Sequence, residues 1–245
     1  MVGGNILINR RIVTYNQEED FSYLKTTSNL STSIENMSSE LCIKELKNIT
    51  LVPRSGTHNN FKIGEEIIMY VISGELLYSD NIGNLETLSS GNFLYINSMD
   101  GITYDIFNSG IDFLDIIEIT LYTNNNSYIQ KKNSKPPILN KYDFKNSIEN
   151  QWIYAISPLN GLAPIKSNCD INIYFALLQP NKDLTFTINK DRQGYLFQCY
   201  GETEIFTDNC DNITLTGSDS AYISNETFEV KANIPSNILL IETAT

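Results

Sequence analysis

Few side chains in this 245-residue chain are suited to nucleophilic or metal chemistry. His58 is the only histidine, and the four cysteines are Cys42, Cys169, Cys199 and Cys210. A Ser-His-Asp or Cys-His mechanism would depend on His58 alone, because both need an imidazole as the general base. His58 lies in a polar stretch of sequence, and we interpret it as an ordinary loop histidine.

Metal binding is limited by the same shortage of histidine. Protein sites for iron, nickel, copper and zinc rely on imidazole ligands, often joined by carboxylates. A residual site made of His58, Glu66 and tyrosines is the alternative that the composition leaves. Glu65 and Glu66 are adjacent in a predicted strand, so their side chains point to opposite faces and cannot act as a pair. We therefore expect no metal and no cofactor.

The cysteines indicate a reduced protein. They form no C-x-x-C pair and are too sparse for a disulfide scaffold. Cys210 is expected at the tip of a turn, where a thiol is open to oxidation, whereas Cys42, Cys169 and Cys199 alternate with polar residues and are expected to be buried. Asp208 and Asp211 disfavour a thiolate at Cys210. A structural role is favoured, and Cys210 is the one possible redox residue.

The overall charge excludes some classes of partner. There are 29 acidic against 17 basic side chains, giving a net charge of -12. Nucleic acid and anionic membranes would be repelled. No basic region precedes an apolar stretch at the start, and no run of about 18 apolar residues occurs. We expect a cytoplasmic protein whose partner is a small molecule or another protein.

A motif occurs twice along the chain. Gly74-Glu75 is followed by Ser79-Asp80-Asn81, and Gly201-Glu202 is followed by Thr207-Asp208-Asn209. In both copies a leucine, a glycine and an aromatic segment come next. Glycine and asparagine supply the positive φ that a hairpin needs, and the flanking residues favour strands. The pattern predicts an internal duplication, although chance similarity between polar turns is the alternative.

Strands are predicted throughout both halves. They include Ile67–Ile72, Ile116–Tyr122, Ile171–Leu178 and Leu184–Ile188. This spacing is typical of an all-β sandwich or barrel. A polar stretch containing Pro136-Pro137 resembles a connector, so we predict domains at 1–135 and 136–245. Residues 31–41 and 141–150 are weak candidates for short helices.

Several segments resemble the pirin family of two-domain cupins. They are Gly64 to Glu75, Ser79 to Asn84, Gly91-Asn92 through Ile106, and Ile156 to Gly161. The resemblance implies an all-β fold of two tandem cupin barrels, each a double-stranded β-helix or jelly roll. It covers most of the chain and is most specific around Tyr70–Asn84.

The metal ligands of the family are replaced in this chain. Pirin-type cupins hold one metal ion in the first barrel with three histidines and one glutamate. On the matching motif, these positions are Asn60, Lys62, Tyr104 and Ile106. The chain therefore resembles a metal-free branch of the family whose cysteines are linked to redox responses. A single divalent iron, nickel or copper ion in an unorthodox site is the alternative.

The tyrosines of the first half suggest what fills the vacated position. Tyr70, Tyr78, Tyr95 and Tyr104 lie on strands that line a cupin barrel, and only some of them can point inward. With Asn60 and Lys62, Tyr104 would form either a hydrogen-bonded plug or a pocket for a small acidic or planar ligand. The plug is favoured over the pocket.

Three classes of function stay open. The first is a non-catalytic bicupin that binds a small ligand or a protein partner, in a regulatory role. The second, implied by the family, is a quercetinase-type dioxygenase, although metal-assisted oxygen chemistry needs the ion. The third is a metal-free enzyme of unknown mechanism. Fold alone does not choose among them.

Overall fold

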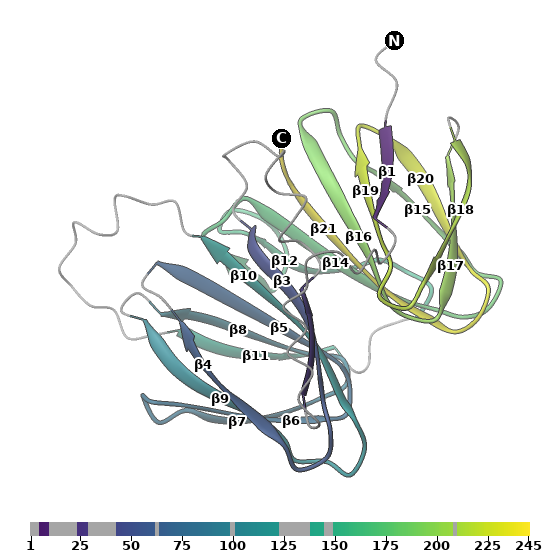
Figure 1. Ribbon diagram of the computed structural model, residues 1–245. Helices are drawn as coiled ribbons and strands as arrows, with labels where there is room; N and C mark the ends of the chain where they lie inside the picture. Colours follow the sequence, from purple (N-terminus) through teal and green to yellow (C-terminus); the bar gives the residue numbers. More distant parts are fainter. Residues whose placement is uncertain are drawn as a thin grey trace. The chain divides into compact units, whose positions relative to one another are not determined.

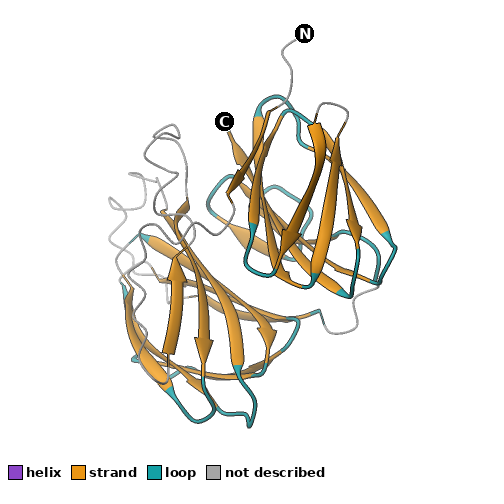
Figure 2. Ribbon diagram, turned by 45° about the vertical axis from the view of Figure 1, so that its right-hand side comes forward, coloured by secondary structure: helices purple, strands orange, loops and turns teal. Residues whose placement is uncertain are grey.

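The chain folds entirely into β-strands and loops wherever the structure describes it. The structure, a computed structural model, describes residues 5–9, 24–28, 43–61, 64–98, 101–122, 138–144, 149–207 and 210–245. These residues form strands grouped into two compact units (Figures 1 and 2). None of the described residues forms a helix with the length and hydrophobicity needed to cross a bilayer.

The N-terminal barrel consists of two sheets. Its large sheet has the order β11 (Ile138–Asp143), β8 (Asn92–Ser98), β5 (Glu65–Ser73), β10 (Leu114–Tyr122), β3 (Ile43–Leu51) and β2 (Leu24–Ser28). Its small sheet has the order β4 (Gly56–Phe61), β9 (Ile102–Asn108), β6 (Glu75–Asp80) and β7 (Leu85–Ser89). Apolar side chains of both sheets form one buried cluster between them.

The C-terminal barrel repeats this order. Its large sheet runs β1 (Asn5–Asn9), β19 (Ser220–Ser224), β16 (Arg192–Tyr200), β21 (Ser236–Ala244), β14 (Ile171–Leu178), β12 (Ile153–Pro158) and β13 (Ile165–Ser167). Its small sheet runs β15 (Asp183–Thr187), β20 (Thr227–Ala232), β17 (Glu202–Thr207) and β18 (Cys210–Thr216). Apart from the additional β13, strand corresponds to strand in the two barrels. The expected duplication is therefore visible in the topology.

The division of the chain differs from the expected boundary at residue 135. β11 pairs with β8 and completes the N-terminal barrel, whereas β1 pairs with β19 and belongs to the C-terminal barrel. In each barrel, the strand beside β8 or β19 therefore comes from the segment that precedes the other barrel. The composition of the chain does not predict this exchange, because strand pairing depends on which sheet edge is open to the strand in the folded protein.

The predicted strands agree with the structure, and the helix predicted at 141–150 does not. The four strands predicted above correspond to β5, β10, β14 and β15. Of the helix predicted at 141–150, residues 141–143 belong to β11, and the helix predicted at 31–41 lies outside the described residues. Pairing with β8 outweighs the weak helical preference, because the strand satisfies the backbone hydrogen bonds of a sheet edge.

Glycine is required where β5 turns into β6. Gly74 has a φ of 87°, and a Cβ added there would lie 2.6 Å from the carbonyl oxygen of Phe113. The equivalent Gly201 has a φ of 88°, and its added Cβ would lie 2.4 Å from the carbonyl oxygen of Pro235. Both turns therefore require positive φ and a close backbone approach, which only glycine provides.

We predict that Gly74→Ala destabilises the N-terminal barrel strongly. The strained φ and the clash with backbone together should lower the free energy of unfolding by about 3 kcal/mol, measured by urea unfolding followed by circular dichroism. Gly83→Ala is the matched control, because Gly83 also has positive φ but no atom lies within 4 Å of its added Cβ. It should cost about 1 kcal/mol. Equal losses in the two variants would contradict the prediction.

Candidate functional site

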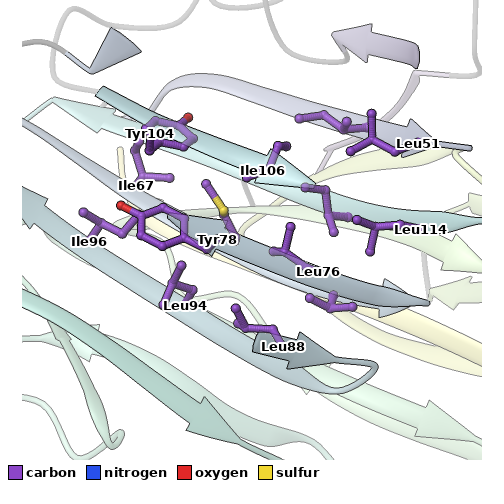
Figure 3. Packing of buried hydrophobic residues seen from close by; sticks show 14 of the residues in the cluster. Leu51, Ile67, Leu76, Tyr78, Leu88, Leu94, Ile96, Tyr104, Ile106 and Leu114 are labelled. Atoms are coloured by element: carbon purple, nitrogen blue, oxygen red, sulfur yellow. The ribbon is translucent and has the colours of Figure 1, made fainter. Parts of the chain in front are cut away.

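The alternation of side chains along the strands decides which residues enter the N-terminal barrel. Tyr78 on β6 and Tyr104 and Ile106 on β9 belong to the cluster between the two sheets. Figure 3 shows the hydroxyl groups of Tyr78 and Tyr104 at the end of this cluster near Ile67 and Ile96. The cluster is thus apolar along most of its length and polar at this end.

A buried hydrogen bond forms the centre of the candidate site. The Tyr104 hydroxyl donates to Oε2 of Glu118 on β10 at 2.8 Å, and both side chains are buried. Lys47 on β3 places its Nζ 3.8 Å from Oε1 of Glu118 and 3.0 Å from Oε2 of Glu45. A phenol, a carboxylate and a lysine from three different strands therefore converge at one point.

Burial controls the protonation of these groups. It raises the pKa of Glu118, and the nearby Lys47 ammonium and the Tyr104 hydroxyl oppose that rise. Burial also raises the pKa of Tyr104, and the neighbouring Glu118 charge raises it further. The pKa of Tyr78 is raised by burial and by Asp80, to which its hydroxyl donates at 3.1 Å. Both phenols therefore stay protonated and act as hydrogen-bond donors.

Strand β4 contributes an amide to the same end of the barrel. Asn59 pairs with Tyr104 in the ladder between β4 and β9, so the two side chains share a face. The Nδ2 atom of Asn59 is buried and has no hydrogen-bond partner among the described residues. A buried donor without a partner is costly, and in a native protein it needs an explanation.

The residues singled out from the sequence reach different places. Tyr104 and Ile106 both lie inside the barrel, as expected. Asn60 pairs with Thr103 rather than with Tyr104, and its side chain is outside the description. Lys62 lies outside the described residues. The residue of β4 that pairs with Tyr104 is Asn59, which the sequence analysis did not single out.

His58 and Glu66 do not join the interior of the N-terminal barrel. His58 is not a loop residue but lies on β4, where its exposed Nδ1 is 2.7 Å from Oδ1 of Asp105. Glu66 is buried on the face of β5 opposite Ile67, and Nδ2 of Asn97 donates to its Oε1 at 3.5 Å. Glu65, on the other face, pairs with Lys44 at 2.6 Å. The expectation that the two glutamates point apart is confirmed.

The tyrosines and cysteines behave largely as the strand pattern predicts. Of the four tyrosines, Tyr78 and Tyr104 belong to the interior cluster, while Tyr70 stacks on Phe93 and Tyr95 lies near Asn97. Cys169 and Cys199 are both buried, and burial raises the pKa of the Cys199 thiol. Cys42 lies outside the described residues. Cys210 begins β18 opposite Thr207 instead of occupying a turn tip, and its side chain is not described.

The ligand set that the resemblance implies does not fit these positions. Ile106 has no donor atom, and the Tyr104 hydroxyl is committed to a buried carboxylate. Within the described ranges, no three His, Cys, Asp or Glu side chains are grouped closely enough to hold a metal ion. The chemistry available to the site is hydrogen bonding by a carboxylate, an amide and a phenol.

The C-terminal barrel serves as an internal comparison for this site. Glu118 pairs with Met69 and Leu240 pairs with Leu196, and these partners lie the same number of residues before Gly74 and Gly201. The same register makes Tyr104 equivalent to Phe228, Asn59 to Phe186 and Lys47 to Tyr174. At every one of the four positions, the C-terminal barrel has an apolar or aromatic residue where the N-terminal barrel has a polar one.

The equivalent residues of the C-terminal barrel pack on one another. Tyr174 and Phe186 meet edge to face with ring centroids 4.9 Å apart, and Phe186 and Phe228 are 6.1 Å apart. Leu240 lies in the same buried cluster. At the position of Glu118 the C-terminal barrel therefore has an apolar residue, and its own buried carboxylate, Glu242, lies two residues further along β21. Glu118 was missed by the sequence reasoning, although a lone glutamate in the run Ile116-Ile117-Glu118-Ile119 is a visible signal.

Comparisons with known proteins agree with this architecture. Residues 155–243 match the family model described as the quercetinase C-terminal cupin domain. A pirin-like protein of Caulobacter vibrioides is 24% identical over 180 residues, which is 72% of each chain. The bacterial pirin YhhW of Escherichia coli, solved in complex with nickel(II), superposes with a TM-score of 0.78 at 17% identity, covering 98% of this chain and 99% of that one.

A quercetin 2,3-dioxygenase of Acinetobacter baumannii has the same fold. Its structure superposes with a TM-score of 0.68 at 13% identity, covering 90% of this chain and 80% of that one. Two similar cupin barrels in one chain define a bicupin. The C-terminal barrel of this bicupin matches the quercetinase C-terminal cupin model, and most of the chain is similar to the pirin-like protein of Caulobacter.

We predict that the stability of the N-terminal barrel depends on pH through Glu118. Because burial raises its pKa above the unfolded value of 4.5, the stabilising contribution of this carboxyl is complete below that pH. The contribution is lost as pH rises through the higher folded pKa. Glu118→Gln has no ionisable group there, so its free energy of unfolding relative to wild type should increase with pH above 4.5.

The measurement is urea unfolding of both proteins over a range of pH values. Glu75→Gln is the control, because Glu75 is exposed on β6 of the same barrel. It removes a carboxylate from the same barrel and leaves the buried site unchanged. A difference for Glu118→Gln that does not vary with pH would contradict the assignment.

We also predict that the site can be replaced by its equivalent from the C-terminal barrel. Tyr104→Phe alone leaves Glu118 without its hydroxyl donor and should cost about 1–3 kcal/mol. Tyr104→Phe with Glu118→Leu removes both polar groups, so stability should return to wild type or exceed it by up to about 3 kcal/mol. Thermal and urea unfolding test this, and a double variant less stable than Tyr104→Phe would contradict it.

Proposed function

We propose that this pirin-like bicupin acts by binding and does not carry out metal-dependent oxygen chemistry. The observation that carries the proposal is the buried hydrogen bond from Tyr104 to Glu118, beside Ile106, at the positions where the family resemblance places metal ligands. An isoleucine cannot ligate a metal, and a phenol that donates to a buried carboxylate is held in its protonated form.

The polar set itself supports a binding role. Replacing a buried ion pair by apolar residues is often neutral or stabilising, and the C-terminal barrel has such residues at the same positions. The N-terminal barrel instead keeps Glu118 and the Nδ2 of Asn59, which has no hydrogen-bond partner in the part of the chain that the structure describes. A small molecule with an acceptor for the amide and a donor for the carboxylate would satisfy both groups. A plug formed only by the described side chains leaves the Asn59 donor without an acceptor.

The alternative is a quercetinase-type dioxygenase that uses one iron, nickel or copper ion. It is favoured by the names of two similarities, the quercetinase C-terminal cupin model and the Acinetobacter dioxygenase. The first concerns residues 155–243, which lie outside the barrel that holds the metal in the family. The second rests on fold at low identity.

We predict that the protein purified without chelators contains no stoichiometric iron, nickel, copper, zinc or manganese. Elemental analysis measures this directly. We expect no oxygen consumption with quercetin above the rate in buffer containing the same added metal. One bound ion per chain, with quercetin turnover that Glu118→Gln abolishes, would show that the dioxygenase alternative is correct.

The variant with Asn60→His, Lys62→His, Tyr104→His and Ile106→Glu is the matched gain-of-function control. It restores the ligand types at the positions assigned from the family motif, and we expect it to take up metal that the wild type does not. If it folds and takes up none, the assigned register of β4 is the first assumption to revise, since Asn59 rather than Asn60 pairs with Tyr104.

A further inference from the structure

The outer face of the small sheet differs between the two barrels. Phe107 on β9 pairs with Leu77 on β6, and the equivalent pair in the C-terminal barrel is Lys231 on β20 with Glu204 on β17. Charged residues at these positions are typical of a strand face in contact with water. The N-terminal barrel presents an aromatic and an aliphatic residue at the same two positions.

The loop after β9 extends this apolar face. Phe107 is 38% exposed, Ile111 is 85% exposed and Phe113 is 58% exposed. We call these three residues the loop patch. The corresponding loop of the C-terminal barrel, residues 233–235, is shorter and has Ile234 as its single exposed large apolar residue. The N-terminal barrel therefore exposes three large apolar side chains within seven consecutive residues, and exposed apolar patches are typical of interaction sites.

The loop patch is held in place by a buried asparagine. Nδ2 of Asn108 donates to the carbonyl oxygens of Leu51 at 2.9 Å and Asp112 at 2.8 Å, and its Oδ1 accepts from the backbone N–H of Gly110 at 3.0 Å. The equivalent residue of the C-terminal barrel is Ala232. A surface ordered before binding loses less conformational entropy when a partner docks.

Phe107 is also fixed from below. A Cβ added to Gly56 would lie 3.1 Å from Cδ2 of Phe107, so the ring lies directly over the glycine backbone. Gly56 pairs with Phe107 in the ladder between β4 and β9. The aromatic ring is therefore supported by its own sheet while part of it stays exposed.

The charges around the loop patch indicate the kind of partner. Glu75 on β6, Asp105 on β9 and Asp112 in the loop are exposed carboxylates. Arg54 is also exposed and its backbone N–H donates to the carbonyl oxygen of Asn108, while His58 is paired with Asp105. In a symmetric dimer the same patch would face itself and bring these carboxylates together, in a chain of net charge -12. A partner with basic residues beside its apolar contacts avoids that repulsion.

We propose that the loop patch is a docking surface for a protein segment that presents apolar side chains flanked by lysine or arginine. The surface lies outside the barrel and is independent of the chemistry at Glu118. Peptide binding at the loop patch can therefore be tested whatever the metal analysis shows.

The test is selection of random linear peptides displayed on phage against the full-length wild-type protein. Enriched peptides are then synthesised, and their affinity is measured by fluorescence anisotropy. We expect them to combine aromatic or aliphatic residues with lysine or arginine, and to bind more weakly as salt is raised. Phe107→Lys with Phe113→Ser should weaken them about tenfold or more, as loss of central anchors does.

Two controls make the test decisive. Phe107→Lys introduces the residue that the C-terminal barrel has there, so the variant should fold, which circular dichroism checks. Ile234→Ser removes an exposed isoleucine from the other barrel and should leave peptide affinity unchanged. Peptides that bind the patch variant as well as wild type, or no enrichment of basic apolar peptides, overturn the proposal. Self-association in sedimentation velocity that the patch variant abolishes also overturns it, in favour of a second copy.

Discussion

The register of β10 between β5 and β3 is the constraint on which the N-terminal barrel depends. Its ladder places Glu118 between Met69 and Lys47, so that the carboxylate faces inward at the level of Tyr104. A shift by one residue would send Ile117 and Ile119 inward and turn Glu118 to the other face. The position of one carboxylate is thus set by hydrogen bonds along two whole strands, and the polar end of the barrel follows from it.

Comparison of the two barrels distinguishes the residues that the fold requires from those that it allows to vary. Glycine at 74 and 201, with the same strand order in both units, reflects shared geometry. At two other equivalent positions the barrels have residues of opposite character: Glu118 corresponds to Leu240, and Phe107 corresponds to Lys231. In the first pair the N-terminal barrel has the polar residue in its interior, and in the second it has the apolar residue on its exterior. Both departures run against ordinary partitioning of side chains, and both occur in the N-terminal barrel.

Much of this could be predicted from the sequence. Strand periodicity and the repeated turns indicated an all-β duplication, and the family motif placed Tyr104 and Ile106 inside the barrel. Other features depend on pairing between distant strands and escaped prediction. Asn59 rather than Asn60 lies opposite Tyr104 because the ladder of β4 and β9 sets that register. Glu118 became part of the site only through its bond to a residue on another strand. The exchange of β1 and β11 left no trace in composition.

That exchange gives the chain an order of assembly. β1 is synthesised before the strands of the N-terminal barrel, yet its partner β19 follows that barrel, so the large sheet of the C-terminal barrel is incomplete until after the N-terminal barrel has been synthesised. The N-terminal barrel likewise waits for β11, which emerges after its other strands. Until then β8 presents an open sheet edge, and open edges invite pairing with the wrong strand. Cleavage of the connector between β10 and β11 would separate β11 from the N-terminal barrel and β1 from the C-terminal barrel. Neither half of the duplication is therefore complete without the other.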